Sequence, residues 1–354
     1  MEFDRRSLLA AIVLTTSACA RANGETDEQR ETSRKSLSSA SDWQAFSAVY
    51  LRPDGRIVDN GNGAISHSEG QGYGMLLAEA AADRAAFDSM WGWTEKTLAR
   101  SDVALYSWRY SPGEAVPVSD PNNATDGDIL IAWALLRAHA RWRQPEHMAR
   151  AREIATTIRT KLIHRQAGRS LLLPALTGFV RPDRTTINPC YYIWPAIDLF
   201  RRIDPSDAWE ALARDGERLA RDARFGPSRL PCDWVDVTAT GVVLPAADKP
   251  PRFGFDAIRI PLYQLAGNRR SLATEVVSYW RQLIERKTMI PAWIDVVSGE
   301  RAPYALSPGG TAMVGHLLHA SDMVPASLPV LGSDYYSDVL TLLSRLLLPG
   351  KTGR

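Results

Sequence analysis

Apolar residues recur at helical spacing along most of the chain. Between residues 125 and 142, for example, Ile131, Leu135, Ala138 and Trp142 fall on one face of a helix. The same periodicity predicts helices near residues 42–50, 70–82, 84–100, 126–142, 146–163, 189–202, 206–224, 255–267, 269–286, 308–320 and 332–347. Such a series of helices with short connections is typical of an all-α protein.

Several of the predicted helices form pairs of different character. The first member follows a Gly- or Pro-rich loop and carries Gly, Ala and aromatic residues, as at Gly72, Tyr73 and Gly74. The second carries charges along one face, as in residues 149–153. A helix that is apolar all round is buried, whereas one with a polar stripe faces water. We therefore predict alternating inner and outer helices, about six pairs of which would close into an (α/α) barrel. Since no long linker divides the chain, we predict one domain over residues 41–354.

Two short runs within the predicted loops alternate between apolar and polar residues with a period of two. They cover residues 105–110 and 293–297. This alternation is typical of strands, and we expect small β-hairpins in the loops at the rim of the barrel.

The first residues differ in character from the rest of the chain. Arg5 and Arg6 precede a short apolar run, Leu8–Leu14, which small residues follow up to Cys19. This pattern predicts an export signal over residues 1–21, since a membrane span needs ~20 apolar residues. The paired arginines suit twin-arginine export, and residues 16–19 resemble a lipoprotein cleavage box that would put a lipid anchor on Cys19. We therefore predict a periplasmic or secreted protein.

A polar leader follows the export signal. Residues 22–40 are charged or polar with almost no apolar content, which predicts disorder. If cleavage removes or modifies Cys19, Cys190 and Cys232 remain as the cysteines of the mature protein. An oxidising compartment would allow them to pair, and two separate buried thiols are the open alternative.

Composition excludes some classes of partner. The formal net charge is only +2 and the arginines are scattered along helices, so the sequence indicates no nucleic-acid surface. The histidines are dispersed, and the loosely spaced pair His316 and His319 has the character of ordinary helix residues, so we predict no metal and no cofactor. The eleven Trp and eleven Tyr instead favour a carbohydrate ligand, because sugar rings stack on flat aromatic faces. Most such aromatic side chains nevertheless lie in a core.

Acidic residues collect where the predicted inner helices begin. Glu69 follows a Gly-rich turn, Asp126 and Asp128 open the next inner helix, and Asp256 opens another with Arg259 one turn on. A pair of carboxylates in an aromatic cleft is the equipment for hydrolysis of a glycosidic bond. One group donates a proton to the leaving oxygen while the other, ionised, activates water or attacks.

The same acids have a purely structural interpretation. Asp is a preferred helix cap, and both Asp and Glu are favoured in first turns by the helix dipole. Ser68 would cap the helix of Glu69, and Thr125 or Asp126 would cap the next. Asp256 and Arg259 would then form an ordinary ion pair one turn apart.

One long segment resembles a known family. Residues 124–142, ATDGDILIAWALLRAHARW, are similar at every position to the signature of glycoside hydrolase family 8. Four further segments support the resemblance: SEGQGYGM at 68–75, NPCY at 188–191, LPCDW at 230–234 and FDAIR at 255–259. The family usually has Ser at the position of Cys190. The resemblance covers residues 42–348, and the layout is most similar to the periplasmic endoglucanases of bacterial cellulose synthesis operons.

The resemblance implies an (α/α)6 barrel and an inverting endo-β-1,4-glucanase, a cellulase. Glu69 would be the general acid, Asp256 the general base, and Asp126 would hold and distort the sugar at the cleavage subsite. Tyr191 and Arg259 would line that subsite. As an acid, Glu69 would need a raised pKa, supplied by aromatic surroundings or by Asp126. Further candidates for sugar contacts are Trp108, Trp133, Trp194, Tyr263 and Gln71.

Two alternatives stay open at this point. The same fold would also suit chitosan, xylan or mixed-linkage β-glucan, and the loop residues do not separate these polymers. A non-catalytic polysaccharide-binding protein that reuses the barrel is the alternative from another class, but it would be expected to lack one of the paired acids. Both Glu69 and Asp256 are present. The expected partner is a polysaccharide chain, bound by a monomer.

Overall fold

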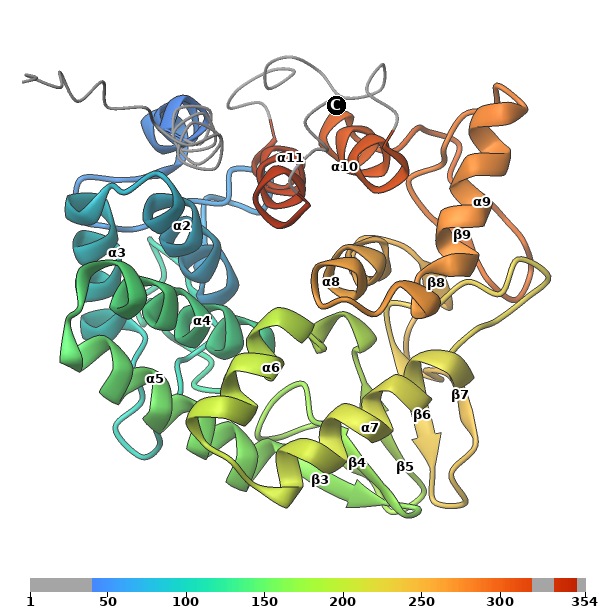
Figure 1. Cartoon of the computed structure of the whole chain (residues 1–354), viewed down its shortest axis with the longest axis horizontal. Coiled ribbons are helices and arrows are strands. Elements are labelled where there is room, and N and C mark those ends of the chain that lie inside the picture. Colours follow the sequence, from blue (N-terminus) through green and yellow to red (C-terminus); the bar gives the residue numbers. More distant parts are fainter. Residues whose placement is uncertain (1–39, 320–333, 349–354) are drawn as a thin grey trace, which may run out of the picture.

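The computed structural model describes residues 40–319 and 334–348, which form a chain of α-helices linked by loops and short strands (Figure 1). A first helix covers residues 40–50. It is followed by α2 (Ser68–Ala80), α3 (Arg84–Thr97), α4 (Thr125–Trp142), α5 (Pro145–Thr157), α6 (Trp194–Ile203), α7 (Asp207–Asp222), α8 (Ile260–Ala266), α9 (Thr274–Glu285), α10 (Pro308–Leu318) and α11 (Tyr335–Leu347). The periodicity predicted each of these helices. The predicted export signal and Cys19 lie outside the described residues, as does the leader except for its last residue.

The helices lie in two concentric layers. Figure 1 shows α2, α4, α6, α8 and α11 nearer the centre, with α3, α5, α7 and α9 outside them. The inner helices α2 and α4 are buried on nearly all sides, whereas α7 buries one stripe that includes Trp209, Leu212 and Leu219. The layout is the (α/α) barrel predicted from the alternation. Among the helices in the described part of the chain, none combines the length and the apolar character that a membrane crossing requires.

Glycines allow α2 and α4 to pack closely at the end that carries the acids. A Cβ on Gly127 would collide with Ser68 Oγ and with the backbone nitrogen of Glu69, and a Cβ on Gly72 would lie 2.5 Å from that of Leu130. These contacts bring the first turns of the two helices together. One continuous hydrophobic core, from Trp43 to Leu343, lies behind them.

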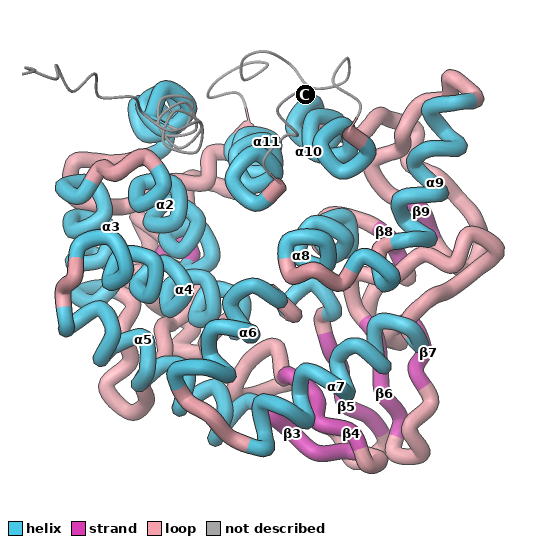
Figure 2. The backbone as a smooth tube through the Cα atoms, in the orientation of Figure 1, coloured by secondary structure: helices cyan, strands magenta, loops and turns pink. Residues whose placement is uncertain are grey.

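The strands form four small sheets in the segments that connect the helices (Figure 2). Two of them contain hairpins, β3 (Ile163–Gln166) with β4 (Arg169–Leu172), and β6 (Val235–Thr238) with β7 (Val243–Pro245), the latter extended by β5 (Arg184–Ile187). The other two sheets join segments far apart in sequence: β1 (Ser66–His67) pairs with β2 (Arg109–Tyr110), and β8 (Arg252–Phe253) with β9 (Ile294–Asp295).

The two strand runs predicted from sequence pair both locally and with distant segments. Arg109–Tyr110 and Ile294–Asp295 are strands, and each pairs with a distant segment. Pro291 also bridges Ala305 and Ile294 bridges Arg301, so the second run forms a small hairpin with the residues that follow it, as predicted. In the first run, Tyr106 bridges Ala99, and its backbone N–H donates to the Asp128 carboxylate at 2.9 Å.

Candidate active site

Glu69 lies in the first turn of α2, which begins directly after β1. The helix is capped by His67, whose Nδ1 accepts the backbone N–H of Gly70 at 3.0 Å. The predicted cap, Ser68, is wrong, because Ser68 is already the first helical residue. Capping by His67 also brings its Nδ1 to 3.8 Å from the Glu69 carboxylate. The imidazole thus contributes both to the helix start and to the charge around Glu69.

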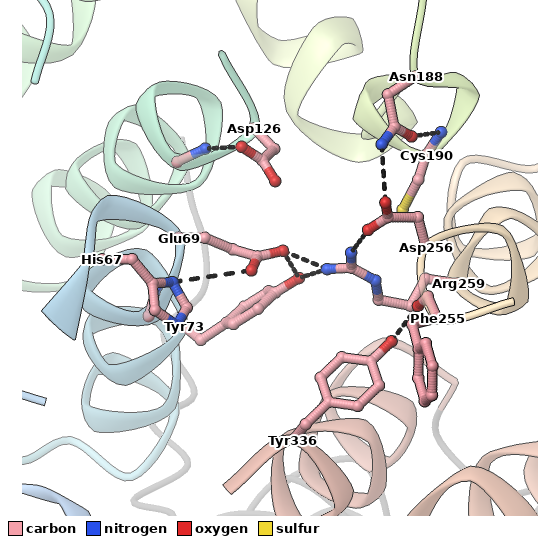
Figure 3. Close-up of polar contacts among 12 residues, drawn as sticks. His67, Glu69, Tyr73, Asp126, Asn188, Cys190, Phe255, Asp256, Arg259 and Tyr336 are labelled. Carbon is pink, nitrogen blue, oxygen red and sulfur yellow. Dashed lines mark hydrogen bonds and ion pairs between the residues drawn. The ribbon is translucent and has the colours of Figure 1, made fainter. Parts of the chain in front are cut away.

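The two acids at the start of α4 have different surroundings. Asp128 is fully buried and holds two loops, since it accepts the N–H of Tyr106 at 2.9 Å and the amide of Asn123 at 2.8 Å. Asp126 accepts the N–H of Gly127 at 2.8 Å, and its carboxylate faces the group around Glu69 (Figure 3). The predicted cap at Thr125 is wrong, because α4 has no side-chain cap and the Thr125 hydroxyl donates to Leu173 O at 2.7 Å.

A single guanidinium links the acids of α2 with those before α8. Asp256 precedes a short 3-10 turn, Ala257–Arg259, and Arg259 is only 3% exposed. The Nη2 of Arg259 contacts Asp256 Oδ1 at 2.6 Å, while its Nη1 forms an ion pair with Glu69. Figure 3 shows the Glu69 and Asp256 carboxylates on either side of this guanidinium. The expected ion pair between Asp256 and Arg259 is therefore present, and the same cation also binds Glu69.

Uncharged hydrogen-bond donors fix the two carboxylates further. The hydroxyl of Tyr73 donates to Glu69 Oε1 at 2.9 Å and lies 3.0 Å from the hydroxyl of Tyr263. The amide of Asn188 donates to Asp256 Oδ2 at 3.0 Å. Sequence reasoning missed Tyr73 and Asn188 as site residues. Tyr73 had a readable signal, because it follows Glu69 by four positions and so lies on the same face of α2.

The charges of this cluster shift the three carboxylates in different directions. Burial raises the pKa of Glu69, but Arg259, His67 and Tyr73 together outweigh it, so that the pKa is lowered. Burial raises the pKa of Asp126 well above its usual value, and the charge of Glu69 adds to the effect. Burial and Glu69 also raise the pKa of Asp256, although Arg259 opposes them. The expected rise in the pKa of Glu69 is therefore wrong for the protein without a ligand.

The cluster holds more negative than positive charge. Three carboxylates face one guanidinium, and interacting groups of this kind titrate as a set rather than singly. In that set the pKa of Glu69 is lowered, whereas the pKa values of Asp126 and Asp256 are raised. Perturbed carboxylates in an aromatic setting mark a functional site.

Aromatic rings with accessible faces surround the carboxylates. Phe255, directly before Asp256, is 52% exposed, and Tyr191 and Trp108 are half-buried. Trp234 and Phe179 stack with their centroids 5.7 Å apart and their planes 6° apart. Tyr191 meets the same Trp234 edge-on at 6.2 Å. Sequence reasoning had not selected Phe179, Trp234 or Phe255.

Comparison with known proteins agrees with this geometry. Residues 29–349 match the profile of glycosyl hydrolases family 8. The chain belongs to this family. It is 43% identical over 267 residues to an endoglucanase of Cellulomonas uda, covering 75% of this chain and 74% of that protein. It is 40% identical over 313 residues to a probable endoglucanase of Novacetimonas hansenii, covering 86% and 89%.

Solved structures show the same fold. An endo-β-1,4-glucanase of Acetobacter xylinum superposes with a TM-score of 0.83 at 39% sequence identity, covering 87% of this chain and 97% of that one. A family 8 endo-β-1,4-glucanase from an Achatina fulica gut metagenome has a TM-score of 0.82 at 38% identity, covering 86% and 96%. The predicted (α/α)6 barrel of this family 8 chain is confirmed.

Four predicted sugar contacts of this family 8 chain are wrong, because the side chains are buried in the core. Gln71 is 0% exposed, and its amide bonds the backbone of residues 55, 57 and 90. Trp133 and Trp194 are 4% and 2% exposed, and Arg269 covers Trp194 at 4.1 Å. Tyr263 is 1% exposed and reaches the site only through the hydroxyl of Tyr73. Which face of an inner helix points to the centre was not readable from the sequence.

The described residues contain neither a disulfide nor a group arranged to bind a metal ion. Cys190 and Cys232 are both buried free thiols, so the alternative without a disulfide holds. Within residues 40–319 and 334–348, no group of three or more His, Cys, Asp or Glu side chains is arranged to hold a metal ion. His316 hydrogen-bonds the hydroxyl of Ser344 at 2.7 Å, as an ordinary helix residue would.

Proposed function

We propose that this family 8 chain is an endo-β-1,4-glucanase that hydrolyses cellulose with inversion at the anomeric carbon. The observation that carries the proposal is the placement of Glu69 and Asp256 on opposite sides of one buried arginine, with Asp126 beside them. The relatives in Cellulomonas uda and Novacetimonas hansenii are an endoglucanase and a probable endoglucanase, which supports the same substrate class. The resemblance of the layout to the periplasmic endoglucanases of bacterial cellulose synthesis operons favours a role alongside cellulose synthesis.

In this mechanism Glu69 protonates the leaving oxygen and Asp256 activates a water molecule on the opposite face of the sugar. An inverting pair is separated by roughly 6.5–9.5 Å, so that the water fits between the base and the anomeric carbon. In the free protein the guanidinium of Arg259 lies between the two carboxylates and forms an ion pair with each. Asn188 and Arg259 bind the two oxygens of Asp256 and so set the direction in which it accepts a proton.

Binding of the sugar would change the state of Glu69. Arg259 lowers the pKa of Glu69 in the free protein, so Glu69 is ionised there. A sugar hydroxyl that accepts a hydrogen bond from Arg259 would weaken this ion pair, and exclusion of water would then raise the pKa of Glu69. Burial and the charge of Glu69 raise the pKa of the nearby Asp126. Asp126 would orient the sugar at the cleavage subsite.

Exposed rings would provide the sugar-binding surface. Tyr191 and Trp108 are half-buried. In this proposal Tyr191 and Arg259 line the cleavage subsite, and a sugar ring stacks on Trp108. We add the stacked pair Trp234 and Phe179 and the exposed ring of Phe255 to this surface. Several such rings suit a linear chain bound at several subsites, as an endo-acting enzyme requires.

The test is an assay of substrate and stereochemistry together. Reducing ends are measured after incubation with carboxymethyl cellulose, chitosan, xylan and mixed-linkage β-glucan, and the first-formed anomer is observed by NMR. We expect the highest rate on the β-1,4-glucan and an initial α-anomer. An initial β-anomer would exclude inversion. Binding to a polymer without any hydrolysis would favour the non-catalytic alternative.

We further propose that the protein works outside the cytoplasm as a monomer, on the basis of the export signal and Cys19. Fractionation of cells that express the full chain tests the location, and light scattering tests the monomer. If Cys19 is lipidated, the chain will partition into detergent, and the Cys19→Ala variant will not. Equal partitioning of both chains into the aqueous phase would exclude the lipid anchor.

A further inference from the structure

Asp233 holds the segment that carries Asp256. Its Oδ1 accepts the backbone N–H groups of Gly254, Asp256 and Ala257 at 3.1, 3.1 and 2.7 Å. Its own N–H donates to Arg252 O at 2.8 Å. One residue therefore fixes the backbone on both sides of Asp256, as well as Asp256 itself. Asp233 lies in the loop before β6, in the LPCDW segment that sequence analysis noted but assigned no role.

The packing around this contact leaves little freedom. A Cβ on Gly254 would lie 2.6 Å from Asp233 Oδ2, so only glycine fits where the segment passes the carboxylate. Burial raises the pKa of Asp233 to about 7, and the charge of Asp256 adds to the rise, while the three backbone hydrogen bonds oppose it. The nearest titratable neighbours are Asp256 across the loop and the buried thiol of Cys232 beside it in the chain.

We infer that Asp233 is a positioning residue for Asp256, which it places by holding its backbone and influences by its charge. The inference rests on the proposed function, in which Asp256 is the general base. Asn188 and Arg259 hold the carboxylate of Asp256, whereas Asp233 holds its main chain. Side-chain and backbone restraints together leave the carboxylate one orientation toward the water. Misplacement of a reacting group by ~1 Å can reduce a rate 10²-fold.

Two substitutions separate the backbone contact from the charge. Asp233→Ala removes both, and we expect kcat to fall about 100-fold with KM changed by less than about threefold, since no sugar contact is lost. Asp233→Asn keeps an oxygen that can accept the three N–H groups but has no charge. We expect it to retain kcat within about tenfold of the wild type. Asp233 becomes charged only near pH 7, so its charge acts on Asp256 near neutral pH. Asp233→Asn removes this ionisation, and the pH profile of kcat/KM should therefore shift near pH 7 rather than at its acidic limb.

Asp236 provides the matched control, since it is a buried aspartate three positions further along the same segment. It accepts the Ala247 N–H at 2.9 Å and the Thr186 hydroxyl at 2.6 Å. Asp236→Asn should leave the pH profile of kcat/KM at the wild-type position, because its contacts hold the sheet rather than the Asp256 segment. The assays use the full chain on carboxymethyl cellulose, and circular dichroism confirms that each variant is folded.

The outcomes distinguish this inference from the proposed function. If the wild type hydrolyses none of the four polymers, the proposed function fails. If the wild type is active and Asp233→Asn shows its pH profile and its kcat unchanged, the positioning role is overturned, even when Asp233→Ala does not fold. A shift of the same size in Asp236→Asn would also overturn it, since the effect would then not depend on contact with Asp256.

Discussion

Each end of α2 carries a glutamate that pairs with arginine, but the net charge of the surrounding side chains is opposite at the two ends. At the C-terminal end, Glu79 is 3% exposed and lies between Arg137 at 2.5 Å and Arg141 at 2.6 Å, both on α4. At the N-terminal end, Glu69 shares the single Arg259 with two other carboxylates. The same helix pair thus carries a cluster with excess positive charge at one end and excess negative charge at the other.

The difference separates a structural ion pair from a reactive site. At the C-terminal end, two cations compensate the buried carboxylate of Glu79, and both of these cations are also partly exposed to water. Three carboxylates around one cation cannot all be ionised at low cost, so a proton stays in the cluster and moves when the surroundings change. The count of charges around an acid, rather than burial alone, therefore identifies the end of α2 that can do chemistry.

The most direct way to break this comparison is to remove the charge at each end of α2. Glu69→Gln should lower kcat by about 10³-fold on carboxymethyl cellulose, because the general acid is lost, with the melting temperature unchanged or higher. Glu79→Gln should keep the kcat of the folded protein but lower the free energy of unfolding by about 1–3 kcal/mol. Equal kcat values for the two variants would contradict the distinction.

The next test compares the two acids at the start of α4. Asp126→Asn should reduce kcat by about 10²-fold, since the sugar loses its orienting carboxylate and the cluster its proton. Asp128→Asn should leave kcat within about threefold and lower the free energy of unfolding by about 1 kcal/mol, because one hydrogen bond to a loop is lost. Steady-state kinetics and urea denaturation measure both. A larger loss of kcat in the Asp128 variant than in the Asp126 variant would contradict the assignment of Asp126 to the active site.

The burial of the two acids at the start of α4 also predicts how stability depends on pH. Burial raises the pKa of Asp128 to about 7. A carboxyl whose pKa is higher when folded than when unfolded, where it is about 3.9, makes the folded state bind more protons between these values. This group's contribution to the free energy of unfolding should therefore fall as pH rises from about 4 to about 7.

Asp126 acts in the same direction, since burial raises its pKa well above the usual value. Urea denaturation at several pH values measures the slope, and Asp128→Asn should reduce it. An unchanged slope in that variant would mean that Asp128 does not titrate in this range.

The last test concerns stability alone, through the close packing of α2 against α4 beside the acids. Gly127→Ala puts a methyl group against Ser68 and Glu69, and we expect a loss of about 1–3 kcal/mol in the free energy of unfolding. Gly92 in α3 has nothing within 4 Å of an added Cβ, so Gly92→Ala should instead stabilise the protein by about 0.4–1 kcal/mol. Thermal denaturation measures both, and a loss in Gly92→Ala would contradict the difference.

Local features of this protein were readable from residues close together in the chain. The helices followed from apolar periodicity, because a helix face repeats every 3.6 residues whatever it packs against. Glu69 and Asp256 stood out because each opens an inner helix beside Gly and aromatic residues. Asp126 and Asp128 could not be separated in this way, since both occupy the same first turn and differ only in what faces them.

The errors share one cause. Gln71, Trp133 and Trp194 have the residue types of a sugar-binding surface, and burial in the core removes them from it. Phe179 and Phe255 have accessible rings but no local pattern that marks them. The predicted caps at Ser68 and Thr125 are wrong because each residue is already helical. His67 accepts the N–H at the start of α2, and α4 has no side-chain cap.

The sequence by itself determined the helices, their inner and outer character, the family and the acids from which the site is built. These depend on short-range spacing and on segments long enough to be distinctive. Only the tertiary structure decided that Arg259 binds Glu69 as well as Asp256, and in which direction the pKa of each of the three acids is shifted. Such contacts join residues nearly two hundred positions apart, and a pKa depends on every charge and every layer of protein around the group.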